Sequence, residues 1–530
     1  MSKYFHSLTI ALLLSTACSF PRALAEIRMP TMISDHAVLQ RQVPIHIWGW
    51  GSAGEHVTVM LHAQSRSTDA NTYGEWSVWL QPEQAGGPYT LTVSSTAPNS
   101  HPLSITDILI GDVWIASGQS NMEMPLRGFP GSAVVKNAEQ EIAAADQPQI
   151  RLLRIDHKVS DVPIGNVANS WTLCIPKTAA EFSAVAYFFG RTINHEEHVP
   201  IGLIDSTWGG TPIESWMSLD ALGNDASFMP VFAARARFAD EQSRLAEIKA
   251  AEEREDIAAA QAHEPRPQHP WHPLEGSWLP SGLYNGMIAP LTPYSVKGFL
   301  WYQGETNSSP ERAPLYAKLF PAMIADWRAQ WRQGDLPFLY VQISSFHSEG
   351  ENWGLIRDAQ RRTLSVAGTA MAVSLDVGDA SNVHPSDKQT VGARLALAAR
   401  GLVYHDVPEY TGPIFRQATA EPAGMRVWFD TASGDLRPQA VSNVPLRLSG
   451  NFDSAFELAG DDHKFVRAHA VVDGETVLVT NPEVRNPRYV RYAWSNESKG
   501  GLYNQSGLPA STFTSEYFDY QRGYDKDISK

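Results

Sequence analysis

Residues that could carry out acyl transfer occur in four separate segments of this 530-residue chain. Ser120 lies in GQSNMEMP, and Gly210 lies in WGGTPIESW. Gln303 and Glu305 lie in GFLWYQGETN, and His384 lies in HPSDK. A serine hydroxyl can act as a nucleophile, a histidine can act as its base, and backbone or amide N–H groups can stabilise an oxyanion. Because acyl transfer needs these functions at one place, the surrounding elements have to bring the segments together.

Apolar runs that are typical of buried strands lead into these segments. The runs are DVWIAS, IGLIDS, GFLWYQ, PFLYVQI and TAMAVSLDV, and longer helical patterns such as YAKLFPAMIADWRAQW separate them. Continuous apolar strands that alternate with helices predict an α/β fold with a parallel sheet covered on both faces. In a doubly wound sheet, functional groups collect at the carboxyl ends of the strands. We therefore expect the four segments to meet at one edge of the sheet.

Shorter runs with alternating polarity flank this region on both sides. Before about residue 106 they are rich in Val, Ile, Thr, Tyr and Trp and are separated by turn residues, which predicts an antiparallel β-sandwich. Strand-like runs return after about residue 405. The predicted division is a signal segment at 1–25, an N-terminal β-domain at 26–106, an α/β domain at 107–404 with a charged helical insertion at about 228–275, and a C-terminal β-domain at 405–530.

The first 25 residues have the features of a cleaved secretory signal. They contain the basic residue Lys3, the apolar run LTIALLLSTACSF and the small-residue site ALA. We therefore expect an exported protein, periplasmic or secreted, and Cys18 in LSTAC is an alternative site for a lipid anchor. Neither this run nor a later one has the length expected of a membrane span. After cleavage only Cys174 remains, which excludes an intrachain disulfide and a cysteine-based zinc site.

The charge of the chain restricts its partners. The formal net charge is −15 at pH 7, and nucleic acids and anionic membranes both require a positive surface. We therefore expect no nucleic-acid partner. The sequence shows no metal-ligand cluster and no cofactor motif, so we expect neither a metal nor a cofactor.

The ordered blocks of this sequence resemble those of the sialate O-acetylesterase family, within the broader SGNH (GDSL-like) hydrolases. The resemblance extends to SDHAVLQRQVPIHIWGWGSAGEHVTV near the N-terminus and to GLYNQSGLPASTF near the C-terminus. It implies an SGNH-type doubly wound parallel sheet flanked by N-terminal and C-terminal β-domains. It also implies a serine esterase that removes O-acetyl groups from a carbohydrate through an acetyl-enzyme intermediate.

The resemblance also implies roles for individual residues. By position, Ser120 is the nucleophile and His384 is the general base. The backbone N–H groups of Ser120 and Gly210, together with the Gln303 amide, form the oxyanion hole. Gln303 stands where many SGNH enzymes have asparagine, and both side chains donate an amide N–H.

The acid partner of the histidine is the point where this sequence departs from the family. SGNH hydrolases commonly place an aspartate two or three residues before the catalytic histidine, and here those positions hold Asn382 and Ser381. Glu305 is the first candidate acid, because related acetylesterases recruit the glutamate of a QGE block. Asp379 is the alternative acid. A third arrangement is a serine–histidine dyad steadied by a backbone carbonyl or by Asn382.

Three other functions stay open at this point. The substrate could be an acetylated plant hemicellulose such as xyloglucan or xylan, because the family pattern covers both kinds of sugar. A glycosidase would need two carboxylates flanking a sugar, as Glu305 and Asp379 could, but it would leave Ser120 without a role. A non-catalytic carbohydrate-binding protein on an esterase fold is favoured only by the missing aspartate before His384.

Overall fold

The computed structural model describes residues 27–97, 100–267, 269, 272, 276–422, 424–430, 446–449 and 455–516. The expected signal segment, with Cys18, lies outside these residues, so export stays a prediction. Among the described residues, no helix combines the length and apolar character needed to cross a membrane.

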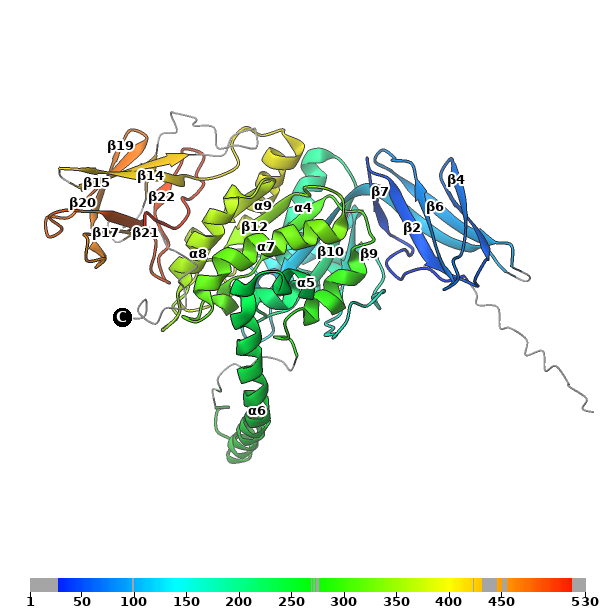
Figure 1. Ribbon diagram of the computed structural model, residues 1–530, viewed down its shortest axis with the longest axis horizontal. Coiled ribbons are helices and arrows are strands. Elements are labelled where there is room, and N and C mark those ends of the chain that lie inside the picture. Colours follow the sequence, from blue (N-terminus) through cyan, green and yellow to red (C-terminus); the bar gives the residue numbers. More distant parts are fainter. Residues whose placement is uncertain are drawn as a thin grey trace, which may run out of the picture.

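Three regions follow one another along the length of the molecule (Figure 1). A β-rich N-terminal region lies at one end, a β-rich C-terminal region lies at the other, and a layered α/β body lies between them. The expectation of a mixed α/β fold with additional β-sheets is therefore confirmed.

The central sheet has a mostly parallel arrangement. Its strands are β7 (Leu103–Gly118), β8 (Gln147–Arg154), β9 (Thr172–Cys174), β10 (Ile201–Thr207), β11 (Gly298–Tyr302), β12 (Phe338–Gln342) and β13 (Thr369–Val373). They lie in the order β13-β12-β11-β7-β10-β8-β9, and only the β8–β9 pair is antiparallel. The order reverses direction around β7, so β7 and its neighbours β10 and β11 end at the place where a doubly wound sheet forms its site.

Helices cover both faces of this sheet. The larger ones are α4 (Ala184–Glu197), α7 (Ala313–Trp331), α8 (Trp353–Arg362) and α9 (Lys388–Ala399). Trp114 of β7 contacts Phe189 of α4, with ring centroids 5.1 Å apart. Phe299 of β11 contacts Trp327 of α7 at 5.3 Å, and Phe299 pairs with Ile115, whose side chain points away from that of Trp114. Helices α4 and α7 therefore lie on opposite faces.

The remaining helical elements are short, apart from one long helix. The short ones are α1 (Ser120–Glu123), α2 (Ala138–Ala143), α3 (Pro176–Ala179), α5 (Leu219–Gly223), η1 (Ile213–Trp216), η2 (Ala226–Phe228), η3 (Tyr284–Ile288), η4 (Ala289–Leu291), η5 (Glu305–Asn307), η6 (Thr363–Ser365), η7 (Leu375–Val377) and η8 (Arg400–Tyr404). The long helix, α6 (Met229–Ala262), lies in the predicted helical insertion and projects away from the body (Figure 1).

The N-terminal region is connected to the body through a shared strand. Its other strands are β1 (Val38–Gln40), β2 (Ile45–Trp50), β3 (His56–Leu61), β4 (Gln64–Asp69), β5 (Glu75–Leu80) and β6 (Gly86–Ser95). β2 pairs with β5, β3 pairs with β4 and β6, and both β1 and β6 pair with β7. The boundary proposed between residues 106 and 107 therefore falls inside β7, which continues from this region into the central sheet.

The C-terminal region contains small antiparallel sheets. Its strands are β14 (Ile414–Glu421), β15 (Gly424–Asp430), β16 (Arg447–Leu448), β17 (Phe456–Ala459), β18 (Val466–Arg467), β19 (His469–Asp473), β20 (Thr476–Thr480), β21 (Tyr489–Tyr492), β22 (Leu502–Tyr503) and β23 (Phe513–Thr514). They form the sheets β14-β15-β20-β19, β18-β17-β21-β23 and β16-β22. Arg357 of α8 is buried and donates hydrogen bonds to the carbonyls of Ala493 and Ser495, which ties this region to the body.

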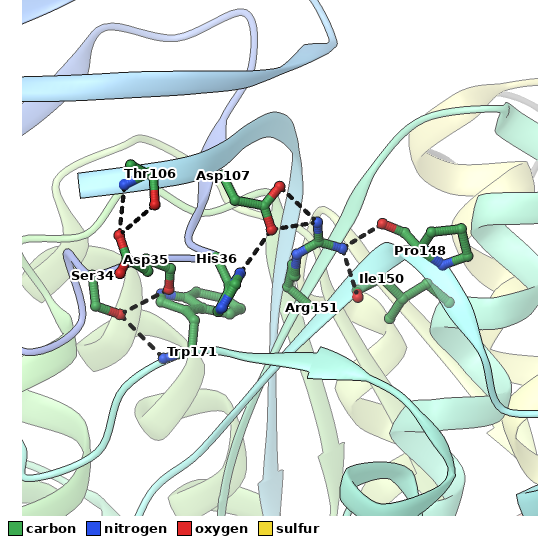
Figure 2. Close-up of polar contacts among 9 residues, drawn as sticks. All are labelled: Ser34, Asp35, His36, Thr106, Asp107, Pro148, Ile150, Arg151 and Trp171. Carbon is green, nitrogen blue, oxygen red and sulfur yellow. Dashed lines mark hydrogen bonds and ion pairs between the residues drawn. The ribbon is translucent and has the colours of Figure 1, made fainter. Parts of the chain in front are cut away.

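A polar cluster holds the chain where β7 passes from the N-terminal region into the body (Figure 2). Asp107 adopts a left-handed conformation there, with a φ of 54°. Its carboxylate lies 2.7 Å from Nδ1 of His36 and 3.0 Å from Nη2 of Arg151. The Arg151 guanidinium also donates to the carbonyls of Pro148 and Ile150. The cluster therefore joins β7, β8 and the N-terminal segment through a partly buried ion pair.

We expect Asp107→Asn to lower the free energy of unfolding by about 1–3 kcal/mol, because it leaves the buried Arg151 guanidinium without its carboxylate. Burial raises the pKa of Asp107, but the contacts with His36 and Arg151 outweigh it and hold the pKa below its ordinary value. The ionised Asp107 therefore stabilises the fold at pH values above the ordinary pKa of aspartate. This stabilisation is lost as the pH falls through the lowered pKa of Asp107.

Denaturant unfolding at pH 7 and at pH 3 measures this effect. A suitable control is Asp69→Asn, which removes a carboxylate that is 72% exposed and pairs with His56 on the surface. We expect that control to change stability by less than about 0.5 kcal/mol. Equal stability of the Asp107→Asn variant and the parent at pH 7 would contradict the proposed role of the cluster.

Candidate active site

Ser120 lies on a tight turn where β7 ends and α1 begins. The turn requires Gly118, which has a φ of 133°, and a Cβ at that position would lie 2.2 Å from the carbonyl oxygen of Tyr302. Gln119 fixes the next residue, because its N–H donates to the Tyr302 carbonyl and its side-chain oxygen accepts from the N–H of Thr306. The end of β11 therefore holds Ser120 at the carboxyl edge of the sheet.

His384 reaches Ser120 from the loop between β13 and α9. Its Nε2 lies 2.8 Å from Oγ of Ser120, although 264 residues separate the two in the chain. The backbone N–H of His384 donates to Oδ1 of Asn382 at 2.9 Å, and the imidazole and the Phe129 ring form a T-shaped contact with centroids 5.2 Å apart. The structure thus brings the predicted nucleophile and base into the contact that general-base catalysis requires.

The surroundings of His384 keep its imidazole neutral. Burial and, to a smaller extent, the charge of Lys388 lower the pKa of His384 to about 4, although the charge of Glu123 acts in the opposite direction. A neutral imidazole can accept the Ser120 proton, whereas an imidazolium cannot.

We expect the acid limb of the pH profile of kcat/KM to lie near pH 4, because activity needs the neutral form of His384. Lys388→Met removes a neighbouring positive charge and should move this limb to higher pH. The profile is measured with a chromogenic acetyl ester from acid to neutral pH. Lys136→Met, which removes an exposed lysine that pairs with Asp387, should leave the limb in place. A parent limb near pH 6.5, the ordinary histidine value, would contradict this assignment.

A buried polar network lies behind the serine–histidine pair. Glu305 is 7% exposed, and its Oε1 accepts a hydrogen bond from Nδ2 of Asn121 at 2.6 Å. Oδ1 of Asn121 accepts from the buried Nζ of Lys388 at 2.5 Å, and Nδ2 also donates to the Val383 carbonyl. Burial raises the pKa of Glu305 despite this hydrogen bond and the nearby lysine. Asn121 follows Ser120 directly, and Val383 directly precedes His384. The hydrogen bond between Asn121 and Val383 therefore connects the two loops that carry Ser120 and His384.

Neither of the predicted acids contacts the imidazole. Glu305 is directed to Asn121, and Asp379 is exposed and accepts hydrogen bonds from the N–H and Oγ of Ser381 at 2.9 and 2.7 Å. Within the described residues, no carboxylate is hydrogen-bonded to the His384 ring. The geometry therefore departs from the expected triad: Ser120 and His384 form a pair, and Asn382 accepts a hydrogen bond from the backbone N–H of the histidine and does not contact its ring.

The structure also departs from the prediction for Gln303. The side chain is completely buried, and its Nε2 donates to the Thr211 carbonyl at 3.1 Å and to Oδ1 of Asn307 at 2.6 Å. The side-chain oxygen of Gln303, Oε1, accepts a hydrogen bond from the Tyr316 hydroxyl. Because both amide hydrogens are used inside the protein, Gln303 supports the loops around the site and does not present a donor to a substrate.

Two backbone N–H groups remain as candidates for oxyanion donors. Gly209 and Gly210 follow β10, and the Gly209 N–H donates to Oε2 of Glu123 at 2.5 Å. Gly210 has a φ of 68°, and its carbonyl accepts from Nε1 of Trp278 at 2.6 Å. No hydrogen bond from the N–H of Ser120 or of Gly210 is present in the described part of the chain. These two groups can therefore receive a developing negative charge.

The serine–histidine pair opens into a cavity of about 670 Å³. Its aromatic lining residues are Phe129, Trp208, Trp278, Phe346 and Trp353, and its charged ones are Glu123, Glu305, Arg312 and Glu351. His157 also lines the cavity, stacks on Trp208 at 4.1 Å and lies 3.0 Å from a Glu123 oxygen. Aromatic faces mixed with polar groups suit a sugar-sized ligand. Among the described residues, no cluster of His, Cys, Asp or Glu could hold a metal ion.

Comparisons with known proteins agree on one family. The sequence matches the family described as carbohydrate esterase, sialic acid-specific acetylesterase, over residues 110–250 and 269–400. It is 32% identical to the sialate O-acetylesterase of Rattus norvegicus, over 92% of this chain and 94% of that protein. For the sialate O-acetylesterase of Homo sapiens, the identity is 30% over 71% of each chain. The crystal structure of a carbohydrate acetylesterase from Xanthomonas citri superposes with a TM-score of 0.77 at 34% identity, covering 93% of this chain and 100% of that one.

Proposed function

Since the chain belongs to the family of sialic acid-specific carbohydrate acetylesterases, which are carboxylic ester hydrolases, we propose that it removes O-acetyl groups from a sialic acid through an acetyl-enzyme intermediate. The observation that carries this proposal is the 2.8 Å contact between Ser120 and His384 at the wall of a sugar-sized cavity. The names of the relatives support sialic acid as the sugar. We also propose that the central body is of the SGNH type.

The proposed first half-reaction transfers the acetyl group to the protein. Nε2 of His384 takes the hydroxyl proton as Oγ of Ser120 attacks the acetyl carbonyl carbon. The resulting oxyanion accepts hydrogen bonds from the N–H groups of Ser120 and Gly210. Collapse of this tetrahedral species breaks the bond to the sugar oxygen, which receives the proton from the imidazolium. In the second half-reaction, His384 takes a proton from water as the water oxygen attacks the acetyl-serine carbonyl carbon. Collapse of this second tetrahedral species breaks the bond to Oγ of Ser120, which receives the proton back from the imidazolium, and the acetyl group leaves as acetic acid, which ionises to acetate.

In this proposal, Asn121, Glu305 and Lys388 position the loops that carry Ser120 and His384 and take no part in proton transfer. Asn121 holds the backbone of Val383, so it fixes the distance between the loops that carry the nucleophile and the base. Glu305 accepts a hydrogen bond from Asn121, and Lys388 donates one to Asn121. The positive charge of Lys388 also favours the ionised form of the buried Glu305 carboxyl. None of these side chains hydrogen-bonds to the imidazole.

We expect Glu305→Gln to lower kcat by about tenfold or less, because Glu305 acts through Asn121, whereas loss of a true triad carboxylate costs about 10⁴-fold. Asp379→Asn should leave kcat within about twofold, since its carboxylate contacts only its own loop. Steady-state rates on a chromogenic acetyl ester measure both variants. A loss near 10⁴-fold in either one would identify that residue as the acid partner of His384 after all.

Acetate release from two substrates tests the proposed function. Purified protein is given 9-O-acetylated sialic acid and acetylated xyloglucan in parallel, with Ser120→Ala as the control. We expect release from the sialic acid that is abolished in the variant. Release from xyloglucan alone would transfer the assignment to acetylated hemicellulose. Release from neither substrate would favour a carbohydrate-binding protein and overturn the esterase proposal.

A further inference from the structure

A second cavity, of about 960 Å³, lies between the N-terminal region and the α/β body. One wall comes from residues 40–44, from His46 and from Trp79 of β5. The other wall comes from Thr292, Pro293 and residues 295–297, and from residues 330–333 and Leu336 at and beyond the end of α7. These two segments precede β11 and β12, so the cavity lies at the amino ends of the parallel strands. Ser120 lies at their carboxyl ends, so the two cavities are separate.

An exposed indole forms part of this second cavity. Trp79 is 55% exposed, and its ring stacks on His46 with centroids 4.2 Å apart and planes inclined by 9°. His46 stacks in turn on Trp48, at 4.9 Å. Nδ1 of His46 lies 3.1 Å from the carbonyl oxygen of Pro293 in the body. His46, which is anchored to the body through Pro293, therefore holds the Trp79 indole in a fixed orientation. Because the indole is already ordered, less side-chain entropy is lost when a flat ligand packs on it.

The charged lining of this cavity has one sign. It contains Arg41, Lys297 and Arg332 but no aspartate or glutamate, in a chain of net charge −15. The Arg41 guanidinium pairs with the buried carboxylate of Asp112 at 2.8 Å, and Nζ of Lys297 lies over the Tyr404 ring at 5.5 Å. Arg332 forms no ion pair within the part of the chain that the structure describes. An anionic ligand is therefore the complementary one for this cavity.

We propose that this cavity is an accessory, non-catalytic binding site for a carboxylate-bearing sugar, with the sugar ring on Trp79 and the carboxylate bound by Arg332 and Lys297. A rigid aromatic surface offers an apolar face to the C–H groups of a sugar ring, and arginine is suited to a carboxylate because it donates two parallel hydrogen bonds. A glycan bound there would remain close to the protein between catalytic events, which raises its effective concentration at the Ser120 cavity.

Fluorine NMR on protein labelled with 5-fluorotryptophan tests this site directly. The Ser120→Ala variant is titrated with 3′-sialyllactose, and Trp79→Phe identifies the Trp79 resonance. We expect that resonance to shift saturably with 3′-sialyllactose and to stay in place with neutral lactose. Arg332→Gln should weaken the binding by about tenfold, the loss expected for a charge-assisted contact.

The control is Tyr73→Ala, which removes an aromatic side chain that is 86% exposed in the N-terminal region and does not line the cavity. We expect it to leave the affinity unchanged. A Trp79 resonance that does not move with 3′-sialyllactose would overturn the site, and an equal response to lactose would overturn the assignment of an acidic sugar. Because the titration needs no catalysis, failure of the esterase proposal would show only in the acetate assay.

Discussion

Replacing Ser120 with alanine is expected to lower kcat/KM for an acetyl ester by about 10⁴-fold or more, the range found when the nucleophile of a serine hydrolase is removed. The variant lacks the only hydroxyl that lies within hydrogen-bond distance of the His384 imidazole among the described residues. The N–H groups of residues 120 and 210 remain, so a small residual rate is expected from the oxyanion site alone.

Two measurements separate the nucleophile from a merely structural serine. Rapid acid quench followed by mass spectrometry should find an acetyl group on Ser120 of the parent and none on the variant. Ser309→Ala removes another hydroxyl that lines the same cavity but does not touch His384, and its rate should stay within about threefold of the parent. An acetyl group on a different residue, or a Ser120→Ala rate within tenfold of the parent, would contradict the mechanism.

The meeting of Ser120 and His384 could be predicted from the sequence because their positions depend on the strands. Ser120 and His384 both follow apolar strands, and the carboxyl ends of parallel strands lie at one edge of a sheet. Glycine at position 118 marked the turn in advance, and the structure shows the close approach to Tyr302 that requires it. The pairing of strand ends therefore determines which loops meet.

The hydrogen-bond partners of the Gln303 and Glu305 side chains could not be predicted from the order of the strands. Gln303 and Glu305 are in one short loop after β11, but their orientation depends on partners from distant segments. The Gln303 amide is bound by Thr211 and by Asn307, and the Glu305 carboxylate is bound by Asn121. A motif shows that an amide and a carboxylate are close to the site. It does not show which of their hydrogen bonds are already made inside the protein.

The division of the chain illustrates a similar limit. Near position 107 the sequence changes from alternating to continuous apolar residues. At the same point β7 changes from partly exposed to buried on both faces. The sequence pattern does not show that one strand continues through the change. The left-handed Asp107 and its contacts with His36 and Arg151 allow β7 to pass from one sheet to the other without a break.

Replacing His384 with alanine is expected to cost about as much as replacing Ser120, roughly 10⁴-fold or more, because the two residues act as a unit. The double variant should therefore be no slower than either single variant. His157→Ala is the matched control, since His157 lines the same cavity but contacts Glu123 and Trp208, and its loss should stay below about tenfold.

Added imidazole provides the sharper test of the dyad. The side chain of His384 lines the cavity and has no carboxylate bound to its ring within the described residues, so a free imidazole has only to occupy the vacated space beside Ser120. We expect it to restore part of the activity of His384→Ala and none of that of Ser120→Ala. The rescue should increase as the pH rises through neutrality and the neutral form of free imidazole accumulates, whereas we expect the parent to be active already above about pH 4. A rescue that does not depend on pH would mean that imidazole acts without accepting the serine proton, and the base would have to be sought elsewhere in the cavity.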